Sequence, residues 1–282
     1  MNNIISFSQK RIRYLILFTL CALVVIYILK ENATYYSFLN SSEDSIGGGS
    51  LLTFFYNLYF GYDFGIFILI VLLVFPLILG MDYFDAVDKK YDDFSIVRIG
   101  YYNYYKNVVF ESIKKIWYFP LVINFTFIFV VILLGYQWSG DSPVLIYGYS
   151  QTIDFILFSL LQIVGWCILN MLTVILSQII GNKYVYGSFV IIYTFAITMI
   201  SLLIGFIMNS VYVPFLGEIT AVLTLVTSPL SLISSRVTHI ASGYSNLLLN
   251  VLTCQLLYLF LILILNKLVV VMRKKKHYVY NH

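Results

Sequence analysis

Apolar runs long enough to cross a membrane recur along this chain and leave few other folds open to it. A helical crossing needs about 20 predominantly apolar residues. Six such segments are present, at residues 14–30, 65–84, 117–135, 153–180, 187–212 and 245–272. Hydrophobic residues make up 61% of the chain and charged residues only 11%, against about a quarter charged in soluble domains. We therefore expect one all-α, polytopic transmembrane domain over residues 1–282.

The basic residues predict the orientation of these six spans, because Lys and Arg concentrate on the cytoplasmic side of a membrane. With six crossings, only Lys30 and Arg236 of the 17 basic residues fall on the opposite side. Both termini are therefore expected in the cytoplasm. Residues 213–244, which contain Pro214 and Pro229, are then predicted as a broken, re-entrant-like external hairpin, because a seventh crossing would place the C-terminus outside.

Residues 85–116 form the one long charged segment, and the topology predicts that it is cytoplasmic. Asp92 or Asp93 can cap a helix. Apolar side chains then recur at steps of three or four, which predicts an amphipathic helix; they are Phe94, Val97, Tyr101, Tyr104 and Val108. Gly100 interrupts the pattern, so we expect a short helix, a bend, and a second helix leading into the third span. Such a helix can lie at the membrane interface or dock on a partner.

Polar residues follow one face of each of two spans. On the fourth span they are Ser159, Gln162, Trp166, Asn170, Thr173 and Ser177, and on the fifth Thr194, Thr198, Ser201, Gly205 and Asn209. Spacing of three or four residues places each set on one helical face. Small and polar residues of this kind pack membrane helices together, or they line a translocation path. For a path, the candidate residues are Gln162, Trp166, Asn170, Thr198 and Asn209.

Motifs for chemistry are sparse. No nucleotide-binding G-x-x-x-x-G-K-[ST], H-E-x-x-H or G-x-S-x-G sequence occurs, and we expect no catalytic residues and no metal site in this chain. The formal charge of +4 is explained by topology, so nucleic acid is not an expected partner. Asp82, Asp85 and Asp88 lie along one helical face and could hold Mg²⁺ on a lipid diphosphate. A lipid-modifying membrane enzyme is therefore one alternative, and a non-catalytic membrane sensor or assembly partner is another.

Four features together suggest a family. They are six spans with both ends inside, a basic N-terminal segment, a charged internal helix between spans two and three, and a Pro-broken external hairpin before the last span. The run Arg98-Ile-Gly-Tyr-Tyr-Asn-Tyr-Tyr-Lys106 is similar to the R-x-G-S-R-x-x-x-x-K run of Gram-positive permeases, although Tyr101 and Tyr102 stand where Ser and Arg are usual. The whole layout resembles the permease of a type-2 ABC exporter.

The resemblance implies a transmembrane permease subunit that exports an amphipathic peptide or another hydrophobic cargo from the cytoplasm or membrane. Separate cytoplasmic ATPase subunits would bind ATP and Mg²⁺, so this chain would need no cofactor of its own. The coupling helix that touches the ATPase would comprise Tyr91, Asp92, Asp93, Phe94, Val97 and Arg98. A second copy or a sister permease would complete the transporter in the plasma membrane. Peptide toxins and bacteriocins are typical cargoes of such permeases in Gram-positive bacteria.

Overall fold

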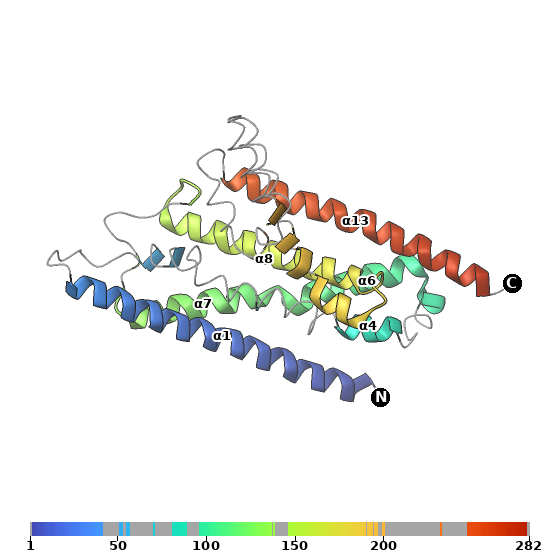
Figure 1. Cartoon of the computed structure of the whole chain (residues 1–282), viewed down its shortest axis with the longest axis horizontal. Coiled ribbons are helices and arrows are strands. Elements are labelled where there is room, and N and C mark those ends of the chain that lie inside the picture. Colours follow the sequence, from blue (N-terminus) through green and yellow to red (C-terminus); the bar gives the residue numbers. More distant parts are fainter. Residues whose placement is uncertain are drawn as a thin grey trace. The chain divides into compact units, whose positions relative to one another are not determined.

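The computed structural model describes residues 2–41, 51–52, 55–56, 70, 81–88, 96–136, 138, 146–189, 191–193, 195–196, 199–200, 232 and 247–280. All regular structure in these ranges is helical. The main helices are α1 (Asn2–Ser41), α4 (Met81–Asp88), α6 (Tyr101–Ile116), α7 (Tyr118–Leu133), α8 (Gln151–Leu176) and α13 (Leu247–Tyr280) (Figure 1). Two compact units divide the chain: residues 1–68 with 118–163, and residues 69–117 with 164–282.

Helix α1 is a single helix of 40 residues. Its apolar part, Ile12–Lys30, has 19 residues and is about 28 Å long, close to the ~30 Å thickness of the hydrocarbon core. Lys30 ends the apolar part without ending the helix, because residues 31–41 contain no Pro or Gly to interrupt it. The predicted first span is therefore confirmed as an apolar helix, and the helix extends well beyond it.

Helices α1 and α7 pack side by side in the first unit and run in the same direction. Their contacts pair Cys21 with Thr126 at 3.6 Å and Asn32 with Tyr136 at 3.0 Å. Partners in the two hydrogen-bonded pairs are 105 and 104 positions apart in the sequence. The difference between the partners' residue numbers is therefore nearly constant along the two helices, as in a parallel pair. In an antiparallel pair the sum of the two residue numbers would be constant instead.

The first half of α8 packs against α7 in the opposite direction. Asn124 of α7 contacts Gln162 of α8, whereas Trp138, just beyond α7, contacts Thr152 and Phe155 near the start of α8. The two helices therefore form a hairpin. Gly135 and Gly148 have φ values of 89° and 82° in its connection, a backbone conformation that glycine adopts without strain.

Aromatic rings fill the interior of the first unit. Phe55 is fully buried, and its ring meets those of Phe127, Phe155 and Phe158 edge to face at centroid distances of 4.7, 5.4 and 5.5 Å. Edge-to-face pairs at such distances add about 0.5–1.5 kcal/mol each beyond the burial of area. This cluster attaches residues 55–56 to the hairpin of α7 and α8.

In the second unit, α6 packs against α13 and against the second half of α8. The side chains that α6 buries are Tyr105, Ser112 and Ile116. Of the predicted stripe, Tyr101, Tyr104 and Val108 are half-buried on the side of α6 that packs into the protein, whereas Val97, before the bend, is 80% exposed. The reason is Gly100, whose φ of 82° reorients the helix that follows, so the periodicity before the bend does not continue after it. The predicted bend itself is confirmed.

Four helical stretches in the described part of the chain are long and apolar enough to cross a membrane: Ile12–Lys30, Tyr101–Leu133, Gln151–Leu176 and Leu248–Met272. They contain or overlap the first, third, fourth and sixth predicted spans, so the protein is a helical membrane protein. The predicted spans 65–84 and 187–212 and the hairpin 213–244 lie largely outside the described residues. Six crossings and cytoplasmic termini remain predictions.

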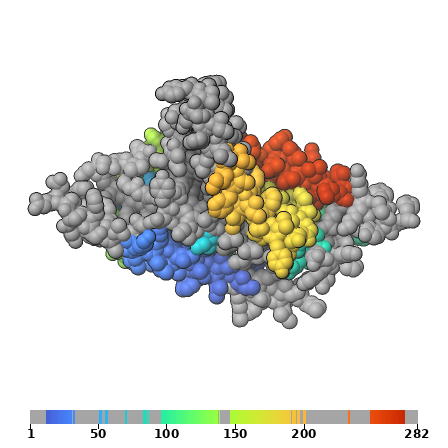
Figure 2. All heavy atoms as spheres, viewed as in Figure 1, coloured from blue at the N-terminus to red at the C-terminus, as the bar shows by residue number. Residues whose placement is uncertain are grey.

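The candidate spans differ in how far the protein covers them. Of the apolar part of α8, 56% is buried, against 28% for α1 and 33% for α13. Both α1 and α13 expose large apolar side chains such as Phe18 and Leu256, and the two helices (blue and red) are visible at the surface in Figure 2. Lipid can cover such side chains, whereas the polar groups of α8 need partners within the protein.

Candidate functional site

The polar stripe of α8 is buried along its whole length. Ser159, Gln162, Trp166, Asn170, Thr173 and Ser177 all have exposed fractions of 8% or less. The predicted shared face is therefore confirmed, and that face points into the protein. Burial of polar groups away from water is costly unless they are hydrogen-bonded, so their partners indicate what the stripe does.

In the first unit, Asn124 of α7 is the partner of the stripe. Its side-chain amide nitrogen donates to the side-chain oxygen Oε1 of Gln162 at 2.8 Å and lies 3.4 Å from the hydroxyl of Ser159. All three residues are buried. These contacts are interhelical hydrogen bonds of the kind that join membrane helices. Gln162 thus has a contact that packs two helices together. Its role in a translocation path stays a prediction.

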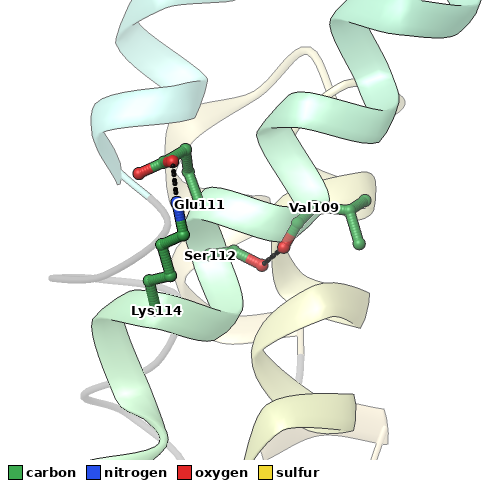
Figure 3. Close-up of polar contacts among 4 residues, drawn as sticks. All are labelled: Val109, Glu111, Ser112 and Lys114. Carbon is green, nitrogen blue, oxygen red and sulfur yellow. Dashed lines mark hydrogen bonds and ion pairs between the residues drawn. The ribbon is translucent and has the colours of Figure 1, made fainter.

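In the second unit, Asn170 joins α8 to α6. Its amide nitrogen donates to the backbone carbonyl of Ser112 at 2.8 Å, while the Ser112 hydroxyl donates to the carbonyl of Val109 at 2.7 Å (Figure 3). The side-chain oxygen of Asn170 accepts no hydrogen bond from the described residues. Buried acceptors of this kind are ordinarily satisfied by another polar group or by ordered water.

The neighbouring turn of α8 holds further polar contacts. The hydroxyl of Tyr186 donates to the carbonyl of Thr173 at 3.2 Å, and the ring of Tyr186 stacks on Phe84 of α4 at 5.3 Å. The hydroxyl of Thr173 donates to the backbone carbonyl of Asn170. The hydroxyl of Ser177, directly after α8, donates to the backbone carbonyl of Val174. Trp166 is 1% exposed. The remaining predicted path residues, Thr198 and Asn209, lie outside the described residues.

We expect the pair Asn124 and Gln162 to contribute measurably to stability. Asn124→Leu and Gln162→Met each remove one member and keep most of the volume. Interhelical hydrogen bonds in membrane proteins average about 0.6 kcal/mol and reach about 1.7 kcal/mol, so a double-mutant cycle should give a coupling energy in that range. The free energy of unfolding in mixed detergent micelles is the quantity to measure. Additive single effects would contradict the hydrogen bond.

The predicted coupling residues are only partly described. Tyr91, Asp92, Asp93 and Phe94 lie outside the described residues. Residues 96–99 form one helical turn that ends at Gly100, whose N–H donates to the carbonyl of Ile96 at 2.8 Å. Val97 and Arg98 on this turn are exposed, and α6 begins directly after it. Val97 and Arg98, the two predicted coupling residues that the structure describes, are therefore accessible at the surface.

Charged side chains of α6 interact along the same helix and with α4. The Lys114 ammonium lies 2.8 Å from the Glu111 carboxylate (Figure 3), and this hydrogen bond lowers the pKa of Glu111. Both side chains are more than half exposed, so solvent screens the pair and it adds little stability. Lys115 instead lies over the ring of Tyr83, 4.4 Å from its centroid, in a cation–π contact that joins α6 to α4.

Asp154 has a structural role that the sequence did not reveal. Its carboxylate is fully buried and accepts hydrogen bonds from the backbone N–H groups of Ile146, Tyr147 and Tyr149 at 2.7, 2.9 and 3.0 Å. It also lies in the first turn of α8, where a negative charge is favoured by the helix dipole. Its position near a helix start was readable from the sequence, but the folding back of the loop onto it was not.

The acidic residues considered for a lipid-modifying enzyme fall on α4. The helix is confirmed over Met81–Asp88, which keeps Asp82, Asp85 and Asp88 on one face by spacing. Asp85 is half-buried, and the side chains of Asp82 and Asp88 lie outside the described part. Among the described residues, no group of three His, Cys, Asp or Glu side chains is placed to hold a metal ion.

Comparison with protein-family models, with curated proteins and with solved structures finds no match for this chain. The resemblance to an ABC exporter permease therefore stays a prediction from the sequence.

Proposed function

We propose that this chain is the transmembrane permease subunit of an ABC exporter, driven by separate ATPase subunits. The observation that carries the proposal is the exposed helical turn 96–99 in front of α6. Val97 is 80% exposed there and stands beside the exposed Arg98. A short helix that offers an apolar side chain next to a guanidinium suits a groove on a cytoplasmic partner, and Arg is enriched in the energetic centres of protein interfaces.

The direction of the helices supports this position for the turn. If α1 and α7 both cross the membrane, their parallel arrangement requires an odd number of crossings between them. The predicted span 65–84 supplies one. Residues 85–116 then lie on the same side as the N-terminus, where the basic residues place the cytoplasm. Val97 and Arg98 would thus be within reach of a cytoplasmic ATPase.

The contacts of α6 offer a route from that turn to the polar stripe. The N–H of Tyr104 donates to the carbonyl of Gly100 at 3.0 Å, which attaches α6 directly to the bend. Further along α6, the carbonyl of Ser112 accepts the hydrogen bond from Asn170 of α8. Closure of the ATPases would push the turn, and α6 would pass the displacement to α8. Coupling of this kind needs an element with two arrangements that both sites bias, and we assign that role to α6.

The stripe of α8 would form part of the wall along which cargo moves. Gln162, Trp166 and Asn170 are the described candidates, with Thr198 and Asn209 on the fifth predicted span. An amphipathic peptide suits a wall that combines amide groups with aromatic rings, because its backbone and its apolar side chains would both find partners.

Co-purification with the ATPase is the direct test. The protein is expressed with its genomic neighbours and purified in mild detergent, and a stoichiometric ATPase should co-elute. The double variant Val97→Asp, Arg98→Glu should lower the recovered ATPase by about tenfold, because loss of one anchor residue costs about 1–2 kcal/mol. The measurement is the ratio of ATPase to permease by quantitative mass spectrometry.

The matched control is Lys183→Glu, which reverses an exposed charge on the same predicted side of the membrane. It should leave the ratio unchanged. Equal recovery from the double variant and the wild type would place the ATPase contact elsewhere. Absence of any ATPase would remove the exporter proposal, and alanine at Asp82, Asp85 and Asp88 would then test the lipid-modifying alternative.

A further inference from the structure

One face of α6 exposes aromatic and basic side chains in alternation. Tyr102, Lys106, Phe110 and Lys114 follow one another at four-residue steps, and Trp117 comes directly after the helix. This spacing keeps all five within about a third of the helix circumference, and they form the aromatic–lysine stripe. Tyr102, Phe110 and Trp117 are 73%, 59% and 48% exposed. The side chains that α6 buries, Tyr105, Ser112 and Ile116, lie on a different face of the helix.

The stripe leads into the edge of the hydrocarbon region. α6 ends at Ile116 and α7 begins at Tyr118, and residues 116–133 contain no charged side chain, so the chain enters the membrane at this point. The contact between Ser112 and Asn170 also places this part of α6 at the membrane edge. Asn170 lies in the last two turns of the candidate span Gln151–Leu176. Twenty-six residues of helix are about 39 Å long, which exceeds the ~30 Å hydrocarbon core, so its last turns reach headgroup depth.

The charges of the stripe are those that attract anionic lipid. α6 carries Lys106, Lys114 and Lys115 against the single acid Glu111. Lys115 lies over Tyr83, which leaves on the stripe Lys106 and Lys114, the latter in an exposed ion pair with Glu111 that solvent screens. Lys114 also lies 5.5 Å from the centroid of the Phe110 ring. Aromatic rings prefer the membrane–water interface, and Lys residues beside them bind acidic headgroups electrostatically.

We propose that the aromatic–lysine stripe of α6 binds the anionic headgroups of the leaflet on its own side of the membrane. Phe110 and Trp117 lie at the level of the glycerol backbone, and Lys106 and Lys114 contact the phosphates of headgroups that carry a net negative charge. The inference is independent of the exporter proposal, because it needs only that α7 crosses the membrane.

Fluorescence quenching of Trp117 tests this site in the full-length protein. The protein carries Trp138→Phe, so that Trp117 and the buried Trp166 remain, and it is reconstituted in phosphatidylcholine nanodiscs. A fixed fraction of the lipid is replaced by phosphatidylglycerol or by phosphatidylcholine, each brominated near the top of the acyl chains. Brominated phosphatidylglycerol should quench the Trp117 fluorescence about threefold more strongly than brominated phosphatidylcholine does, because two lysines attract it. High salt should reduce the difference.

The double variant Lys106→Gln, Lys114→Gln should remove the preference while the thermal unfolding midpoint stays unchanged. Lys30→Gln, at the far end of the apolar part of α1, should retain it. Trp117→Phe should leave a signal with no lipid preference, which assigns the effect to Trp117. Equal quenching by the two lipids in the unmodified stripe would overturn the proposal, and weak quenching by both would show that protein covers the face.

Discussion

Asp154→Ala is expected to destabilise the protein by about 3 kcal/mol, because removal of the carboxylate takes away three hydrogen bonds to a charged acceptor. The carboxylate accepts three N–H groups from residues 146–149. Each of these hydrogen bonds has a charged acceptor, and such bonds contribute about 1.5–3 kcal/mol. The loop would lose its attachment to the start of α8. The free energy of unfolding in mixed micelles is the measurement.

Asp154→Asn is the matched control, since it keeps the shape and one carbonyl oxygen. Oδ2 accepts from both Ile146 and Tyr147, and Oδ1 only from Tyr149. An amide oxygen at the Oδ2 position would keep two of the three bonds without the charge. We therefore expect the asparagine variant to unfold between the wild type and the alanine variant. Equal stability of all three proteins would show that the carboxylate does not hold the loop.

Gly165→Ala is expected to have an effect of similar size for a steric reason. A methyl group at Gly165 would overlap the backbone carbonyl oxygen of Leu232 and lie 2.8 Å from its carbonyl carbon. Both neighbours are backbone atoms, so no side-chain rotation relieves the overlap, and α8 would have to move away from residue 232. Overpacking costs about 1–3 kcal/mol in well-packed cores and more when the backbone must shift.

Gly181→Ala serves as the control, because an added Cβ at Gly181 meets no atom within 4 Å. It should unfold at the same temperature as the wild type in detergent. The Gly165 variant should unfold several degrees lower. A neutral Gly165→Ala would mean that residue 232 does not approach α8 as described.

The apolar runs alone determined most of the secondary structure that the structure describes. Apolar length predicted the first, third, fourth and sixth spans, because a bilayer of fixed thickness demands helices of about 20 residues. The steps of three and four placed the stripe through Gln162, Trp166 and Asn170 on one face, and the structure buries that face. Gly100 predicted a bend, because its freedom of backbone conformation is a property of the residue itself.

The tertiary structure alone decided what those residues contact. Asn124 appeared only as a polar residue in an apolar run, and its bond to Gln162 depends on the rotation of two helices about their axes. The partners of Asp154 depend on how a loop folds back, and the close approach at Gly165 depends on a residue 67 positions later, at 232. Helix periodicity is a local property of the chain. The alignment of α1 with α7 and the pairing of α8 with α6 arise from packing between distant segments, which no local pattern encodes.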